Sequence, residues 1–190
     1  MDGLSAMLIG HSFVRRFKNY VRTTEDKRVK WNLGLERIHI RYDGLGGRKV
    51  GTILNETLEN KLKNPPNIVI LQIGGNDISN GKRPETVASD IENLVMKLHQ
   101  EYHVEYILVS ELIQRKSAPL KYNENVMLCN RILTALLEHI PFAKLWHHRG
   151  IRNSQFNLYI EDGVHYNDRG NYKLYQSYKQ ACIFGESQLN

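Results

Sequence analysis

The segment from residue 67 to residue 73, NIVILQI, is an almost unbroken apolar run between turn-forming residues. A strand with one solvated face alternates apolar and polar residues, whereas a short run that is apolar at nearly every position is buried on both faces. Residues 105–110, EYILVS, have the same character. Two such strands require a sheet that is covered by helices on both sides.

Three further segments complete the expected sheet. Residues 4–10 form a short apolar run, residues 36–42 alternate as a half-buried strand near an edge, and residues 143–147 are a weaker fifth candidate. Between the strands, apolar residues recur at helical spacing. The segments with this spacing are 13–21, 50–62, 87–102, 126–137 and 172–178.

Strands that alternate with helices predict an open parallel sheet. We therefore expect an α/β fold, a three-layer α/β/α sandwich with a five-stranded parallel sheet in the flavodoxin-like order 2-1-3-4-5. All five prolines fall between the expected elements or at helix starts, and the chain has no internal repeat or low-complexity linker. Its 190 residues are enough for one sizeable core, so a single domain over residues 1–190 is predicted.

Composition excludes several classes of protein. With 41% hydrophobic and 24% charged residues the chain is typical of a globular protein, and no apolar run approaches the roughly 20 residues of a membrane helix. The N-terminus lacks a secretory signal, so we expect an intracellular, cytoplasmic protein, with a longer parent chain left open. Cys129 and Cys182 are expected to be buried thiols rather than a disulfide.

The net charge of +6 is concentrated in one segment. Between residues 13 and 30 there are seven basic residues against two acidic ones, Glu25 and Asp26. Two interpretations stay open, namely a solvated helix face and a patch that meets nucleic acid, an anionic lipid surface or an acidic substrate.

No metal or nucleotide site is expected. His147 and His148 are adjacent, and adjacent strand residues point to opposite faces of a sheet, so a single ion would rarely take both. The glycine-rich turn at residues 44–47 has neither the GxGxxG spacing nor a following GK[ST]. We therefore predict that the protein uses no cofactor.

Polar motifs follow the first and third expected strands, and a third motif lies near the C-terminus. Ser12 comes directly after the first strand, Gly74-Gly75-Asn76-Asp77 follows the third, and Asp162-Gly163-Val164-His165 occupies a later loop. Alone, each has a structural explanation: a serine before a helix is an N-cap, and the other two are ordinary turns. Together they lie at the edge of the sheet where parallel folds bind ligands.

The residue types in these motifs match the needs of acyl transfer. Ser12 is the candidate nucleophile, His165 the base that takes its proton, and Asp162 the group that orients the imidazole. The tetrahedral intermediate of such a reaction also needs hydrogen-bond donors for its oxyanion. The backbone N–H groups of Ser12 and Gly47 and the Asn76 amide are suitable.

These residues give the chain a resemblance to the SGNH hydrolase superfamily, which includes GDSL-type lipases and esterases. The nucleophile block corresponds to Gly10-His11-Ser12, the oxyanion glycine to Gly47 (with Gly46 as the alternative register), and the last two blocks to residues 74–77 and 162–165. The matches span residues 10 to 165. One departure is clear, because His11 stands where the family has aspartate.

The resemblance implies a single SGNH-hydrolase-like domain that is a serine esterase for small acyl, acetyl-type esters and works through a Ser12 acyl-enzyme. Asp77 and Tyr166 are expected to border the substrate. Transfer of the acyl group to an acceptor other than water remains an alternative, since it shares that intermediate. The other alternative is a catalytically weak SGNH-like module, similar to retroelement-associated proteins, that binds nucleic acid through the basic first helix.

Overall fold

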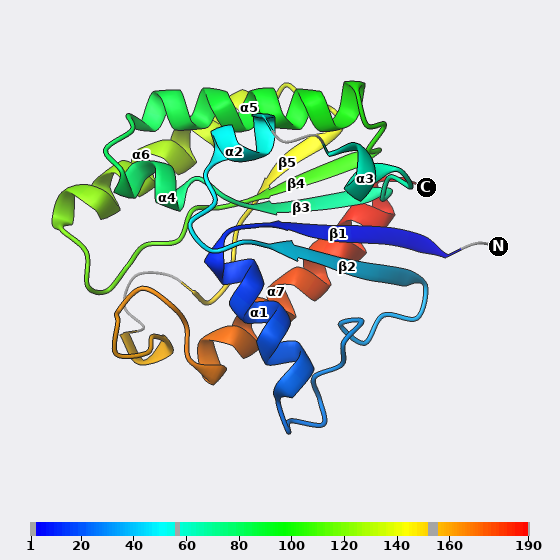
Figure 1. Cartoon of the computed structure of the whole chain (residues 1–190), viewed down its shortest axis with the longest axis horizontal. Coiled ribbons are helices and arrows are strands. Elements are labelled where there is room, and N and C mark those ends of the chain that lie inside the picture. The colour runs from blue at the N-terminus through cyan, green and yellow to red at the C-terminus, as the bar shows by residue number, and fades with distance from the viewer. Residues whose placement is uncertain (1–2, 56–57, 152–155, 190) are drawn as a thin grey trace.

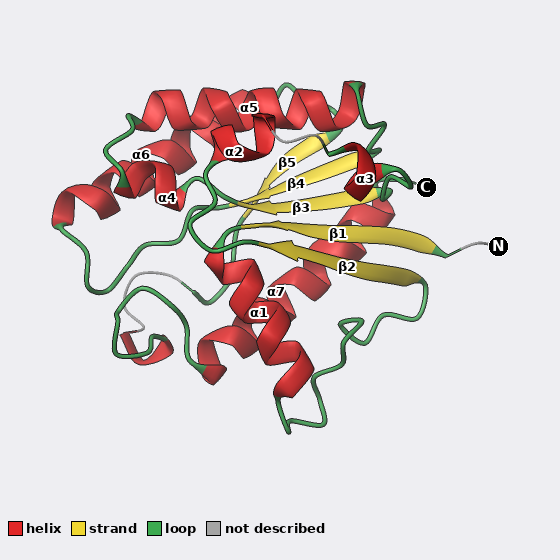
Figure 2. Ribbon diagram, in the orientation of Figure 1, coloured by secondary structure: helices red, strands yellow, loops and turns green. Residues whose placement is uncertain are grey.

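Five parallel strands form one sheet in the computed structural model, which describes residues 3–55, 58–151 and 156–189 (Figures 1 and 2). The order of the strands is β2-β1-β3-β4-β5. Their bounds are Leu4–Gly10 for β1, Ile38–Gly44 for β2, Ile68–Gln72 for β3, Tyr106–Ser110 for β4 and Ala143–Trp146 for β5. The predicted fold class and strand order are confirmed.

Helices cover both faces of this sheet (Figure 1). One face packs against α2 (Val50–Asn55), α3 (Glu59–Leu62), α5 (Pro84–Gln100) and α6 (Leu120–Leu137). The other packs against α1 (Ser12–Thr23) and α7 (Asp168–Ser187). A short α4 (Gly75–Ser79) follows β3, and a 3-10 turn, η1, spans Phe156–Leu158. No helix in the described ranges is long and apolar enough to cross a membrane.

The apolar run of β3 is explained by this layering. Val69 and Leu71 belong to the core under α2, α5 and α6, while Ile68 and Ile70 belong to the core under α1 and α7. All four side chains are fully buried. The expected burial of β3 on both faces is therefore confirmed, whereas the single domain over residues 1–190 stays a prediction.

The two cysteines lie in different cores. Cys129 of α6 is buried on one face of the sheet and Cys182 of α7 on the other, and both are free thiols. Burial raises the pKa of each thiol to about 12. The expectation of buried thiols is confirmed, and neither sulfur is an activated nucleophile.

Several element boundaries differ from the expectation. The segment expected as one helix over residues 50–62 contains two short ones, α2 and α3, and residues 56–57 between them lie outside the described residues. The motif at residues 74–77 is the start of α4 rather than a plain turn. α6 and α7 also begin earlier than their apolar stripes, at Leu120 and Asp168, because their first turns are mostly polar and give little periodic signal.

Candidate active site

The loops that carry the sequence motifs meet at the carboxyl ends of the three strands β1, β2 and β3. Gly10, the last residue of β1, pairs with Gly44 of β2 on one side and with Gln72 of β3 on the other. Ser12 therefore leaves the sheet between the turn that contains Gly47 and the start of α4. This is the point at which the strand order reverses, where parallel sheets form their binding crevices.

A continuous chain of hydrogen bonds connects the three residues predicted as nucleophile, base and orienting group. His165 Nε2 lies 2.8 Å from Ser12 Oγ, and His165 Nδ1 lies 2.7 Å from Asp162 Oδ2. The imidazole therefore has an acceptor for Nδ1–H and leaves Nε2 free to accept the serine proton. The structure brings together residues that are 153 positions apart in the sequence.

The spacing of Asp162 and His165 has a local cause. Asp162 Oδ1 accepts hydrogen bonds of 2.8 Å from the N–H groups of Val164 and His165, which closes a turn, and this leaves Oδ2 for the imidazole. Gly163 has φ of +63°, and a β-carbon there would lie 2.0 Å from Ser117 Oγ, so only glycine fits. Burial alone would raise the pKa of Asp162, but the hydrogen bonds from His165 and Val164 outweigh it and lower that pKa to about 2.

An aromatic ring, Phe13, packs against the imidazole of His165. The Phe13 ring lies 5.6 Å from the His165 ring and 5.1 Å from the Tyr166 ring, and the latter pair is edge-to-face. Tyr166 is only 4% exposed and packs also on Tyr159. Tyr166 therefore has a packing role, and its contact with substrate stays a prediction.

His11 acts as the N-cap of the helix that carries Ser12. Its Nδ1 accepts a hydrogen bond from Phe13 N, the contact that an aspartate in this position could also make. The side chain is 5% exposed, and burial, followed by the charges of Arg115 and His165, lowers the pKa of His11 to about 3. A neutral imidazole thus replaces the carboxylate without removing the cap.

The three candidate oxyanion donors are available for hydrogen bonding. Ser12 is the first residue of α1, whose N–H has no acceptor within the helix. Gly47 has φ of +74°, and no acceptor for its N–H is found among the described residues. Asn76 Nδ2 donates to Arg48 O at 3.1 Å with one hydrogen and retains the other. The positive φ favours Gly47 over Gly46 as the oxyanion glycine.

Asp77 is bonded to the start of α2, just after the turn that contains Gly47. Its carboxylate is 3% exposed, and Oδ2 accepts a hydrogen bond of 3.1 Å from Val50 N at the start of α2. Burial raises the pKa of Asp77 above its usual range, against the opposing effect of the Val50 hydrogen bond. Asn76 and Asp77 therefore bind two positions just after Gly47, Arg48 O and Val50 N, and the substrate contact of Asp77 stays a prediction.

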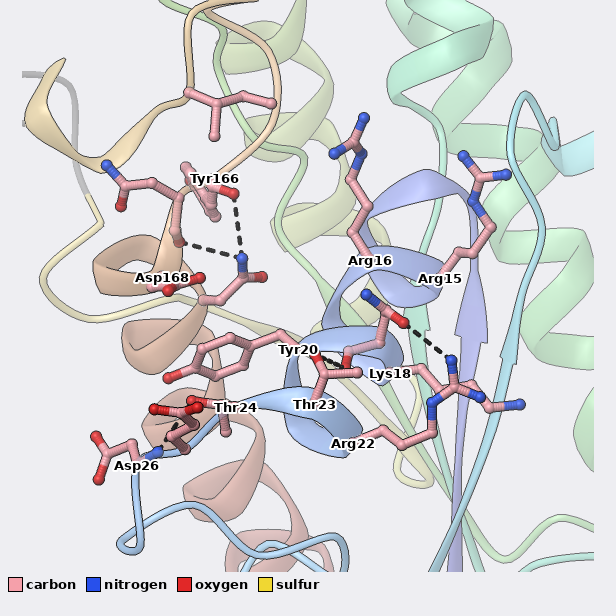
Figure 3. Close-up of a pocket in the computed structure, with 15 residues that line it drawn as sticks. Arg15, Arg16, Lys18, Tyr20, Arg22, Thr23, Thr24, Asp26, Tyr166 and Asp168 are labelled. Atoms are coloured by element: carbon pink, nitrogen blue, oxygen red, sulfur yellow. Dashed lines mark hydrogen bonds between the residues drawn. The ribbon is translucent and has the colours of Figure 1, made fainter.

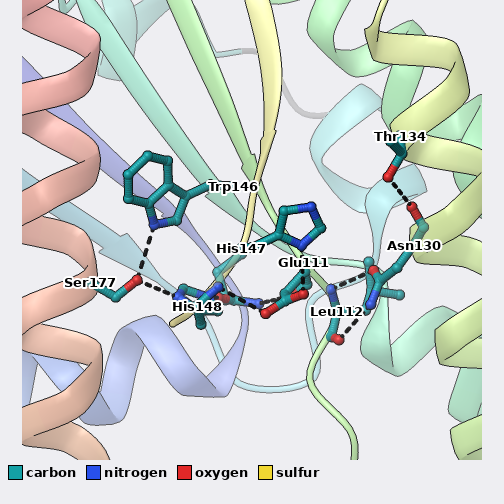
Figure 4. A network of polar contacts seen from close by, with 9 residues as sticks. Glu111, Leu112, Asn130, Thr134, Trp146, His147, His148 and Ser177 are labelled. Carbon is teal, nitrogen blue, oxygen red and sulfur yellow. Dashed lines mark hydrogen bonds and ion pairs between the residues drawn. The ribbon is translucent and has the colours of Figure 1, made fainter. Parts of the chain in front are cut away.

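The adjacent histidines His147 and His148 belong to a separate polar network at the ends of β4 and β5 (Figure 4). His147 Nδ1 lies 2.9 Å from Glu111 Oε2, and His148 N donates to Glu111 Oε1. The fully buried His148 ring contacts Gln72 and Ser177, each at 2.8 Å. The two rings have different partners, and no group of three or more metal-ligand side chains is found in the described part of the chain.

The buried neutral histidines predict a loss of stability in acid. Burial lowers the pKa of both His11 and His148 to about 3, whereas the unfolded side chains have a pKa of about 6.5. The unfolded chain therefore binds more protons between pH 6.5 and pH 3, so the free energy of unfolding falls as the pH decreases through this range. Each histidine contributes a slope of at most about 1.4 kcal/mol per pH unit.

Urea unfolding between pH 7 and pH 4 measures this slope. We expect His148→Asn to reduce the slope and the exposed His139→Asn to leave it unchanged. Equal slopes for wild type and His148→Asn would contradict the assignment of a neutral, buried His148.

Sequence analysis did not single out Arg115 and Tyr122, which the structure brings to the site. A β-carbon on Gly75 would lie 3.2 Å from Tyr122 Oη, 3.5 Å from His11 Nε2 and 4.0 Å from Arg115 Nη2, so these side chains surround the residue next to Asn76. Arg115 lies in the loop after β4. That loop leaves the same edge of the sheet, which is the signal that could have identified it.

The basic segment forms one wall of a groove of about 1050 Å³ beside the site (Figure 3). Arg15, Arg16 and Lys18 of α1 line it, and Tyr166 lies on the opposite side. Asp168 lies on the same side as Tyr166, Glu25 and Asp26 also line the groove, and none of the triad candidates does. The nucleic-acid alternative stays a prediction.

Solved structures share this fold. A GDSL-like lipase from Bacteroides thetaiotaomicron superposes with a TM-score of 0.71 at 15% identity, over 93% of this chain and 86% of that chain. A psychrotrophic esterase from Pseudoalteromonas sp. gives 0.69 at 16% identity, over 94% and 98%. An acetyl esterase variant with an acetate ion gives 0.72 at 12% identity, over 98% and 100%.

A comparison with curated proteins finds no match. The sequence model of the GDSL-like Lipase/Acylhydrolase family, in contrast, matches residues 8–173, a span that contains every predicted motif. The chain therefore belongs to the GDSL-like lipase/acylhydrolase family of carboxylic ester hydrolases, within the SGNH superfamily.

Proposed function

We propose that this protein is a serine esterase for small acyl, acetyl-type esters. The observation that carries the proposal is the unbroken hydrogen-bond chain from Ser12 Oγ through His165 to Asp162. It supports Ser12 as nucleophile, His165 as general base and Asp162 as the group that orients the ring and stabilises the imidazolium.

Acylation follows from these contacts. Ser12 Oγ attacks the ester carbonyl carbon while its proton passes to His165 Nε2, and the carbonyl electrons form the oxyanion. The N–H groups of Ser12 and Gly47 and the Asn76 amide stabilise that charge. When the intermediate collapses, the bond to the alcohol oxygen breaks and His165 gives that oxygen its proton.

Deacylation reverses the roles with water as the nucleophile. His165 takes a proton from water, the resulting hydroxide attacks the Ser12 ester, and the serine oxygen leaves with the proton from His165. The products are the acid and the regenerated enzyme, so the cycle needs no cofactor. An alcohol in place of water would give acyl transfer by the same steps.

The proposed size of the acyl group rests on the side chains beside Asn76. The Tyr122 ring and the Arg115 guanidinium are stacked at 4.4 Å, and both lie against Gly75. A charged guanidinium beside Asn76 disfavours the burial of a long apolar acyl chain there. Two structural neighbours are named as esterases of acetyl groups, one an acetyl esterase and one an acetyl-xylooligosaccharide esterase, which is consistent with a small acyl group.

Labelling with a fluorophosphonate tests the nucleophile. We expect the wild type to take up one label per chain, because an activated serine attacks the phosphorus and displaces fluoride. Ser12→Ala should remain unlabelled, and Ser89→Ala, which removes an exposed serine from α5, should label like the wild type. Mass spectrometry measures the adduct. An unlabelled wild type, or a label retained by Ser12→Ala, would overturn the proposal.

A further inference from the structure

We propose that the ester accepted by this site is anionic, and that its carboxylate or phosphate group pairs with arginines that flank Ser12. The inference rests on the proposed function and names the chemical class of its substrate. Three arginines carry it, namely Arg15 and Arg16 of α1 and Arg115 of the loop after β4.

Arg15 and Arg16 lie on the same side of α1 as Ser12. They follow Ser12 by three and four residues, the spacing at which helical side chains are neighbours, and side chains in helices lean toward the N-terminus. Figure 3 shows both side chains extending in this direction. The Arg15 guanidinium lies 3.2–3.3 Å from the place where a β-carbon on Gly46 would be, next to the turn of Gly47.

Arg115 approaches the site from the side of Asn76. Its Nη1 donates to Ser79 Oγ at 2.9 Å, and its Nη2 makes two long contacts, 3.4 Å to Asn76 Oδ1 and 3.5 Å to Gly75 O. The guanidinium lies over the Tyr122 ring. These contacts fix the position of the cation without neutralising its charge.

None of the three guanidinium groups has a carboxylate within 4 Å in the described part of the chain. Arg115 Nε is also buried without a hydrogen-bond partner. Arg28 and Arg48, in contrast, pair with Asp26 and Asp43. A partly buried cation with an unsatisfied donor is costly, and an oxyanion group on a ligand would satisfy it.

The acidic side chains near the site, Asp162 and Asp77, do not pair with these arginines. Asp162 is held by the His165 ring and Asp77 by Val50 N, and the neighbouring His11 is neutral because burial and the charge of Arg115 lower its pKa to about 3. The site therefore has a local excess of positive charge. Guanidinium groups bind carboxylates and phosphates through two parallel hydrogen bonds, which gives selectivity over a neutral group of the same shape.

The anionic group can belong to either half of the ester, and two matched substrate pairs separate these cases. Monoethyl succinate and its neutral amide analogue, ethyl succinamate, place the group on the acyl half. The pair 4-acetoxybenzoate and 4-acetoxybenzamide places it on the alcohol half. We expect the wild type to prefer the anion of at least one pair by about tenfold or more in kcat/KM, the effect of one charge-assisted hydrogen bond.

Variants assign the preference to particular side chains. Arg115→Met keeps the packing on Tyr122 and removes the charge, and Arg15→Met does the same beside Gly46. We expect one of them to bring the kcat/KM ratio of the preferred pair close to one. Arg22→Met is the matched control, because Arg22 lies about 15 Å from Ser12 along α1. Its guanidinium donates to Asn19. The ratio should be retained in this variant.

The outcomes separate the two proposals. Turnover of the neutral esters with no anion preference in either pair would overturn the inference and leave the esterase proposal intact. If no ester is hydrolysed, calorimetry with the Ser12→Ala protein decides the inference separately: we expect heat of binding from the preferred anion and not from its amide. Equal binding of anion and amide, or binding that Arg115→Met and Arg15→Met both leave unchanged, would also overturn it.

Discussion

Replacing Ser12 with alanine is expected to lower kcat for 4-nitrophenyl acetate by about 10⁴- to 10⁶-fold. The change removes only the hydroxyl whose oxygen lies 2.8 Å from His165 Nε2, so no covalent acyl-enzyme can form. His165→Ala should have an effect of the same order, because the serine then has no base. Release of 4-nitrophenolate in the steady state measures both losses.

A double variant, Ser12→Ala with His165→Ala, shows whether the two residues act together in catalysis or contribute to kcat independently. Because Ser12 and His165 act in the same proton transfer, the double variant should be no slower than the slower single variant. The exposed His139→Ala serves as the control for loss of a histidine and should keep wild-type kcat. Losses that multiply in the double variant, or a Ser12→Ala protein within tenfold of the wild type, would contradict the assigned roles.

The sheet could be predicted because its physical cause is local in the sequence. An apolar run such as residues 67–73 predicts a strand that is buried on both faces of the sheet. In the structure, residues 68–72 form the central strand β3. The strand order then places Ser12 beside Gly47 and Asn76, because parallel strands bring their carboxyl ends to one edge. The proximity of these residues could therefore be predicted from the sequence pattern alone.

Contacts that depend on three-dimensional packing could not be predicted from the sequence. The apolar periodicity does not reveal that His11 caps α1 through Nδ1, since the cap requires a particular side-chain rotamer. The position of its loop after β4 places Arg115 at the right edge of the sheet, but only the folded structure shows that its guanidinium reaches Asn76. The hydrogen bond from Val50 N to the buried Asp77 carboxylate also depends on the fold, and the contact of Asp77 with substrate stays a prediction.

The motif at residues 74–77 thus combines support and chemistry in adjacent side chains. Asp77 holds the start of α2, and Asn76 holds Arg48 O while it retains a second amide hydrogen. If that hydrogen points to the oxyanion, loss of the Asn76 amide should affect the transition state more than the bound ester, because charge on the carbonyl oxygen develops only during the reaction.

Asn76→Ala is therefore expected to lower kcat by about 10²- to 10³-fold with little change in KM, the effect of losing one oxyanion donor. Asn80→Ala is the matched control, because Asn80 is an exposed amide just after α4 that donates to Asn76 O. Steady-state kinetics with 4-nitrophenyl acetate gives both constants, and thermal unfolding reports any loss of support for the turn. A rise in KM at constant kcat would assign Asn76 to uniform binding of the ester, and a loss of activity that tracks the melting temperature in both variants would assign it to structure alone. A loss confined to kcat in a folded Asn76→Ala protein would follow from its amide acting on the oxyanion.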